Sequence, residues 1–185
     1  MRHQNTLELK SAALVIIDMQ EAFRASISDF AAIAAHTALV AHAAQLLELP
    51  VIVTEQYPKG LGRTADEIRA VLPEALEPIE KTAFSSCGAT EFVSRLSATN
   101  ARHVLVCGIE AHICVNQTTH DLLAGGYQVH LLTDCISARH AHDKQAGLAK
   151  MQQSGALPAS IEMALFELLR DARHDQFKAI QKLIK

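Results

Sequence analysis

The chain has 185 residues, of which 49% are hydrophobic and 20% charged, and these proportions predict a single globular domain over residues 1–185. Its formal net charge of -3 argues against nucleic acid or an anionic membrane surface as the main partner. The sequence has no tryptophan and only 4% aromatic residues, which also argues against a surface on which nucleic-acid bases stack.

Short apolar runs alternate along the chain with longer segments of helical periodicity. The first run is continuously apolar, as in a strand covered on both faces. The expected strands are 12–18, 51–54, 78–81, 103–108, 127–134 and 159–163. The expected helices are 29–49, 89–99, 112–126, 142–155 and a last one from about residue 164, and 65–76 is expected to be a short helical region broken near Pro73. This order predicts an α/β fold with a doubly wound, mainly parallel six-stranded sheet between helices on both faces, a Rossmann-like three-layer arrangement.

The carboxyl ends of the predicted strands carry several reactive side chains. Doubly wound sheets bind their ligands at this edge. Asp18 ends the first strand, Lys81 ends the third, and Cys114 opens the helix that follows the fourth. The segment 55–64 is the longest turn-rich stretch, and we expect it to form a loop over the site.

Each of these side chains has a functional and a structural interpretation. At a helix start, unpaired backbone N–H groups and the helix dipole favour the thiolate of Cys114, although a buried cysteine facing the core is common. Asp18 is either a general acid or base or a cap for the following segment. Lys81 is either a positive charge beside the thiolate or a solvated surface residue. Cys107 lies within an apolar strand, so we interpret it as a core residue.

The sequence offers no pattern for a metal or a cofactor. His36 and His42 fall on a helical surface pattern, while His140 and His142 lack a third ligand nearby. Neither a CxxC pair nor a nucleotide-binding fingerprint is present. We therefore expect no metal and no cofactor.

The N-terminal segment does not have the pattern of a signal peptide, because its apolar run is short and ends on Asp18. No apolar run approaches the roughly 18 residues that a membrane helix needs. Four cysteines without a secretory signal indicate reduced thiols and a cytoplasmic location.

The segments LVIIDMQEAF, EKTAFS and CGIEAHICVNQTTHDLLAGGYQVHLLTDCISAR resemble the isochorismatase-like cysteine hydrolase superfamily, over about residues 12 to 170. The loop TEQYPKGLGRT looks most like its isochorismatase-domain-containing subgroup. The resemblance implies a catalytic triad of Asp18, Lys81 and Cys114. It also implies a cis peptide bond between Ile109 and Glu110, with the backbone N–H groups of Glu110 and Cys114 forming an oxyanion hole.

Two departures narrow the chemistry that the resemblance implies. Nicotinamidases bind a metal through histidines in the region that reads TEQYPKGLG here, and this stretch has no histidine. Isochorismatases have glycine where this chain has Cys114. The implied activity is hydrolysis of a small amide, carbamoyl or related C–N substrate through a thioester on Cys114. A non-catalytic small-molecule or protein-binding role and isochorismatase-type vinyl-ether hydrolysis are the alternatives.

The substrate is expected to be a small molecule bound among loops at the same edge. Candidate pocket residues, chosen by position, are Phe23, Gln56, Tyr57, Phe84, His112 and Ile113. Members of the superfamily are usually dimers to octamers, so the resemblance implies a homo-oligomer, a dimer, tetramer or larger. The alanine-rich helix 29–49 is a candidate surface for packing against a neighbouring copy.

Overall fold

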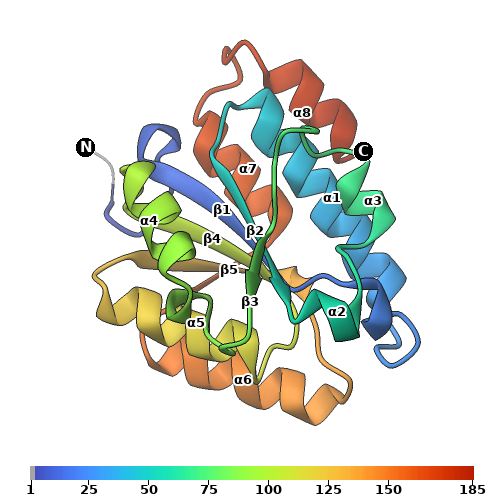
Figure 1. Ribbon diagram of the computed structural model, residues 1–185. Helices are drawn as coiled ribbons and strands as arrows, with labels where there is room; N and C mark the ends of the chain where they lie inside the picture. Colours follow the sequence, from blue (N-terminus) through green and yellow to red (C-terminus); the bar gives the residue numbers. More distant parts are fainter. Residues whose placement is uncertain (1–2) are drawn as a thin grey trace.

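The computed structural model describes residues 3–185 as a six-stranded sheet in the order β3-β2-β1-β4-β5-β6, with every neighbouring pair parallel (Figure 1). The strands are β1 (Ala12–Ile17), β2 (Val51–Gln56), β3 (Ile79–Lys81), β4 (His103–Gly108), β5 (Gln128–Ile136) and β6 (Leu157–Ala159). The strand order reverses between β1 and β4. The predicted α/β fold with a six-stranded sheet is confirmed.

Helices cover both faces of the sheet (Figure 1). One face carries α1 (Phe30–Leu46), α3 (Asp66–Arg69), α7 (Ile161–Leu169) and α8 (Phe177–Leu183). The other carries α4 (Thr90–Ala98), α5 (Cys114–Ala124) and α6 (Ala141–Gln153). The short helix α2 (Pro58–Leu61) follows β2, and single 3-10 turns form at Leu9–Ser11, Glu21–Phe23 and Ser86–Gly88. Among residues 3–185, no helix combines the length and the apolar character required to cross a membrane.

The central strand β1 is fully apolar because helices cover it on both sides. Leu14 and Ile16 pack in the cluster beneath α1, whereas Val15 and Ile17 pack in the cluster beneath α4 and α5. All four side chains have no solvent exposure. Burial of one such side chain contributes about 1.5–3 kcal/mol to stability, so β1 is held firmly in the centre of the sheet. The residue that follows β1, Asp18, is therefore held at the carboxyl edge of the sheet.

The last predicted strand was wrong in extent. It is Leu157–Ala159 rather than 159–163, because Ser160 caps α7 by accepting a hydrogen bond from the Met163 N–H at 3.2 Å. The helical region expected at 65–76, with a break near Pro73, is regular over Asp66–Arg69. The turn-rich segment 55–64 begins as the end of β2 and then forms α2.

Candidate active site

A cavity of about 120 Å³ lies beyond the carboxyl ends of β1, β2 and β4, beside the point where the strand order reverses. This is the position at which doubly wound sheets bind ligands. Its lining consists of Asp18, Phe23, Gln56, Leu61, Phe84, Ile109, Glu110, Ile113 and Cys114. A larger hollow of about 470 Å³ lies at the opposite edge, near the start of β4 and β5, but no cysteine lines it. The smaller cavity is therefore the candidate active site, because Cys114 and Asp18 line it.

Asp18 is held rigidly at the end of β1. Its φ of 53° lies in the left-handed region, which aspartate tolerates better than most residues, and the chain turns sharply there. One carboxylate oxygen accepts a hydrogen bond from Thr54 Oγ1 at 2.7 Å, and the other contacts Lys81 Nζ at 2.7 Å. The residue is 1% exposed. Its carboxylate is thus fixed from two sides without help from solvent.

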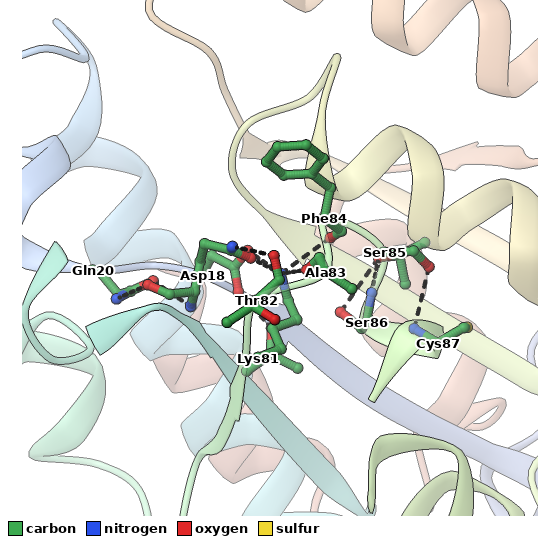
Figure 2. Close-up of polar contacts among 12 residues, drawn as sticks. Asp18, Gln20, Lys81, Thr82, Ala83, Phe84, Ser85, Ser86 and Cys87 are labelled. Atoms are coloured by element: carbon green, nitrogen blue, oxygen red, sulfur yellow. Dashed lines mark hydrogen bonds and ion pairs between the residues drawn. The ribbon is translucent and has the colours of Figure 1, made fainter. Parts of the chain in front are cut away.

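Lys81 is a buried ammonium rather than a solvated surface lysine. Besides Asp18, its Nζ donates to Gln56 Oε1 at 2.8 Å and to the carbonyl oxygens of Ala83 at 3.2 Å and Phe84 at 3.0 Å (Figure 2). An ammonium has three protons, so these four acceptors use all of them. Lys81 therefore acts on its surroundings through its charge and holds the Phe84 segment against Asp18.

Gln56 lines the cavity, and its side-chain amide also bonds to Lys81 and to the Thr82 carbonyl. Its side-chain oxygen accepts from Lys81, and its Nε2 donates to the Thr82 carbonyl at 2.8 Å. Gln20 in turn fixes the Gln56 backbone, accepting from its N–H at 2.8 Å and donating to its carbonyl at 3.0 Å. Although Gln56 lines the cavity, its amide is used in positioning Lys81.

Cys114 occupies the first residue of α5 and is 7% exposed. Burial, and secondarily the negative charge of Asp18, raise the pKa of its thiol to about 12, against the opposing positive charge of Lys81. The helix start predicts a thiolate, but burial and the carboxylate outweigh it. The resting side chain is accordingly a neutral thiol next to a carboxylate and an ammonium.

Two backbone donors lie beside this thiol. The Ile109–Glu110 peptide bond is cis, and Glu110 and Cys114 both line the cavity. Within residues 3–185, neither the Glu110 N–H nor the Cys114 N–H donates a hydrogen bond to another protein group.

The Glu110 side chain is clamped by Arg139. Its carboxylate accepts from the Arg139 N–H at 2.9 Å and from Arg139 Nε at 3.0 Å, and the residue is 5% exposed. The Ala111 N–H donates to the Ser137 carbonyl at 2.8 Å. Gly147 of α6 packs on this segment so closely that a Cβ there would lie 2.7 Å from the Ala111 oxygen. The segment before Cys114 is thus fixed by β5 and α6.

The remaining predicted pocket residues divide into two groups. Phe23, Phe84 and Ile113 line the cavity, and Phe84 is held there by a loop whose Ser85 Oγ donates to Asp121 at 2.6 Å. The structure places Tyr57 and His112 outside the lining. Tyr57 borders a separate surface groove with Lys59 and Glu80, and His112 Nε2 lies 3.8 Å from Asp143.

The sequence did not predict the roles that three residues have in the site. Leu61 and Ile109 line the cavity, and Thr54 fixes the Asp18 carboxylate. A signal for Thr54 existed, because a polar residue ending the second strand lies level with the end of β1 when the two are parallel neighbours, and Ile17 indeed pairs with Thr54. Leu61 and Ile109 carry no comparable signal, since apolar residues near a strand end are ordinary.

The fold and the sequence both match proteins of one family. The isochorismatase domain model matches residues 12–163. Human isochorismatase domain-containing protein 2 is 46% identical over 175 residues, which cover 95% of this chain and 83% of that protein. A secreted isochorismatase effector of Phytophthora sojae (strain P6497) is 39% identical over 180 residues, covering 95% of this chain and 85% of that protein.

A solved structure agrees with these sequence matches. The structure of the MAR1 ribonuclease from Caenorhabditis elegans superposes with a TM-score of 0.92 at 37% sequence identity, covering 97% of this chain and 92% of that chain. The agreement extends over nearly all of both chains, so it includes the sheet edge on which the cavity lies. The chain belongs to the isochorismatase domain family and has the parallel α/β fold of that family.

Proposed function

We propose that the protein is a cysteine-dependent hydrolase of a small amide, carbamoyl or related C–N bond. The observation that carries the proposal is the convergence of the Cys114 thiol, the Asp18–Lys81 pair and two unpaired backbone N–H groups on one cavity of about 120 Å³. A nucleophile beside a base that a third group orients is the arrangement that covalent hydrolysis requires. The family supports hydrolytic chemistry, and the side chains support the cysteine mechanism.

The reaction begins with proton transfer from the Cys114 thiol to the Asp18 carboxylate as the sulfur attacks the substrate carbonyl carbon. The carbonyl oxygen becomes an oxyanion, which accepts hydrogen bonds from the Glu110 and Cys114 N–H groups. Asp18 then gives its proton to the leaving nitrogen. The C–N bond breaks, an amine or ammonia departs, and a thioester remains on Cys114.

Water completes the cycle. Asp18 takes a proton from the water as its oxygen attacks the thioester carbonyl, and the same two N–H groups hold the second oxyanion. The C–S bond breaks, the acid product leaves, and the proton on Asp18 returns to the Cys114 sulfur. Lys81 takes no part in the proton transfers; its Nζ is held by four acceptors, and it offsets the charge of Asp18.

The raised pKa of the thiol bears on the order of events. A pKa of about 12 leaves almost no resting thiolate near neutral pH. The proton must therefore leave as the carbon–sulfur bond forms, which is the task of a general base at hydrogen-bonding range. This supports Asp18 as a participant in the attack rather than only an electrostatic neighbour.

A substrate panel with matched variants tests the proposal. Wild-type protein, Cys114→Ala and Cys114→Ser are incubated with small amides, carbamoyl compounds and esters, and ammonia or acid release is measured. Intact mass should reveal an acyl adduct on the wild type, and both variants should lose turnover. Turnover retained by Cys114→Ala would show that another group performs the reaction.

Thiol labelling tests the same nucleophile without a substrate. An alkylating reagent should modify Cys114 before Cys87, which is half-buried, and before the buried Cys107 and Cys135. Peptide mapping assigns the labelled residue. Equal labelling of Cys87 and Cys114 in the native protein would count against an activated nucleophile.

The alternative functions give different outcomes in the same panel. Vinyl-ether hydrolysis with Asp18 as the acid predicts that Cys114→Gly remains active on an isochorismate-type vinyl ether. A non-catalytic binding role predicts saturable binding of a panel compound without an adduct or product. Single-stranded RNA belongs in the panel because one solved relative is described as a ribonuclease, although the net charge of -3 favours a small molecule.

We also propose that the protein acts in the cytoplasm as a homo-oligomer, without a metal or cofactor. Exposed apolar side chains on α7 support assembly, since Met163 is 53% exposed and Phe166 is 40% exposed. Light scattering after size-exclusion chromatography gives the number of copies. A mass of one chain at micromolar concentration would contradict the assembly.

A further inference from the structure

We infer that the substrate of this site has a small, uncharged and apolar acyl group. The inference rests on the proposed function, because it concerns the space in front of the Cys114 thiol. Most of that space is bounded by hydrocarbon. The apolar lining residues are Phe23, Leu61, Phe84, Ile109 and Ile113.

The acidic side chains in the lining are already paired with the protein. Asp18 is bonded to Thr54 and Lys81, and it is 1% exposed. Glu110 directs its carboxylate to Arg139 and is 5% exposed. The charge of each carboxylate is already balanced by a cation of the protein, so neither carboxylate requires a cationic substrate.

The amide and ammonium groups of the site are committed in the same way. Gln56 uses its side-chain oxygen on Lys81 and its Nε2 on Thr82, and Lys81 donates to four acceptors. Figure 2 shows the Lys81 ammonium enclosed between Asp18 and the Phe84 segment. Among residues 3–185, the cavity lining includes no arginine, lysine or histidine. A substrate carboxylate or phosphate would therefore lose its water, gain no cation and lie near Asp18.

The groups left to a ligand are the Cys114 thiol, the two N–H donors of Glu110 and Cys114, and the second N–H of Gln56 Nε2. All of them are uncharged, so they can meet the reacting carbonyl but cannot neutralise an ionised acyl group. Selectivity for the rest of the acyl group then comes from shape. An apolar cavity of about 150 Å³ holds one benzene molecule, so a cavity of about 120 Å³ suits an acyl group of up to about five carbon atoms.

Iodoacetamide and iodoacetate test the charge preference directly, because they have nearly the same size and differ by one charge. The rate at which each alkylates Cys114 is followed by intact mass and peptide mapping. 2-Mercaptoethanol serves as the reference thiol for the intrinsic reactivity of the two reagents. The amide-to-acid rate ratio at Cys114 should exceed the ratio at the reference thiol by at least about tenfold.

A cation added at the cavity mouth should reverse this preference. Phe84→Lys is suitable, because Phe84 is 54% exposed and the new ammonium remains partly hydrated. The excess ratio should fall by at least about fivefold in Phe84→Lys and stay unchanged in Val93→Lys, a matched change at a residue that is 45% exposed and outside the lining. A wild-type ratio equal to that of the reference thiol, or an equal fall in both variants, would overturn the inference.

Turnover separates this inference from the proposed function. Isobutyramide and malonamate are amides of similar size, one neutral and one anionic, and kcat/KM should favour isobutyramide by at least about tenfold. Cys114-dependent turnover with malonamate preferred would overturn the inference and leave the hydrolase intact. Retention of the alkylation preference with no Cys114-dependent turnover of any panel compound would overturn the hydrolase and leave the apolar, uncharged cavity standing.

Discussion

The buried pair of Asp18 and Lys81 can be tested by stability measurements that need no substrate. The joined atoms are 2.7 Å apart, and the side chains are 2% and 1% exposed, respectively. At an effective dielectric constant of about 20, two unit charges at this distance attract by roughly 6 kcal/mol, which is largely offset by the loss of hydration. Lys81→Met removes the cation and leaves the carboxylate buried. We expect the free energy of unfolding to fall by about 3–5 kcal/mol.

Urea denaturation of Asp18→Asn, Lys81→Met, their double variant and one control variant measures this coupling. Asp18→Asn combined with Lys81→Met removes both charges, so the double variant should recover to within about 2 kcal/mol of wild type. Lys59→Met is the matched control, an exposed lysine on α2 whose loss should cost less than about 0.5 kcal/mol. The reasoning is refuted if Lys81→Met costs less than about 1 kcal/mol, or if the double variant loses the sum of the single losses.

Protonation, packing and the Glu110 clamp each give a further measurable outcome. Burial, and secondarily His103, lower the pKa of His130 from 6.5 to about 4. Between these two pKa values the unfolded chain binds a proton at His130 that the folded chain does not, so the free energy of unfolding decreases as the pH falls from 6.5 toward 4. This group should account for about 2 kcal/mol of the decrease between pH 7.5 and pH 5. Urea titrations at the two pH values should show a decrease smaller by that amount in His130→Gln. Gly147→Ala places a Cβ 2.7 Å from the Ala111 oxygen, so it should destabilise by about 1–3 kcal/mol in urea and slow Cys114 alkylation; normal values for both would contradict the packing. Arg139→Gln frees Glu110 and should lower kcat of amide hydrolysis about tenfold with little change in KM, whereas an unchanged kcat would show that the clamp does not position the N–H donor.

The central strands could be predicted because their burial is written into consecutive residues. β1 and β4 are covered on both faces, so every position except His103 is apolar or small, and no alternation is needed. β6 has only three residues and contains Pro158, so its signal is weaker than that of the helix after it. Ser160 followed by a helical apolar pattern was the available indication that α7 starts at Ile161.

The positions of the three central site residues also follow from the sequence. Asp18, Lys81 and Cys114 lie at or just beyond strand ends, and a parallel sheet gathers such positions at one edge. Their electrostatics could not be predicted in the same way. The pKa of Cys114 depends on how deeply the thiol is buried, which a helix position does not reveal. The Glu110–Arg139 contact joins residues 29 apart through the path of β5, and only the tertiary structure defines it.

Lys81 reaches the Phe84 segment through main-chain carbonyl oxygens alone. Every amino acid presents the same carbonyl, so residues 83 and 84 can change identity without removing an acceptor from the ammonium. The Phe84 side chain contributes a wall of the cavity, while only the backbone of residues 83 and 84 contacts the Lys81 ammonium that balances the charge of Asp18. Substrate preference and acid–base chemistry are thereby separable by mutation. Position 84 is consequently a place where laboratory evolution can retune which molecules are accepted while the reacting groups stay as they are.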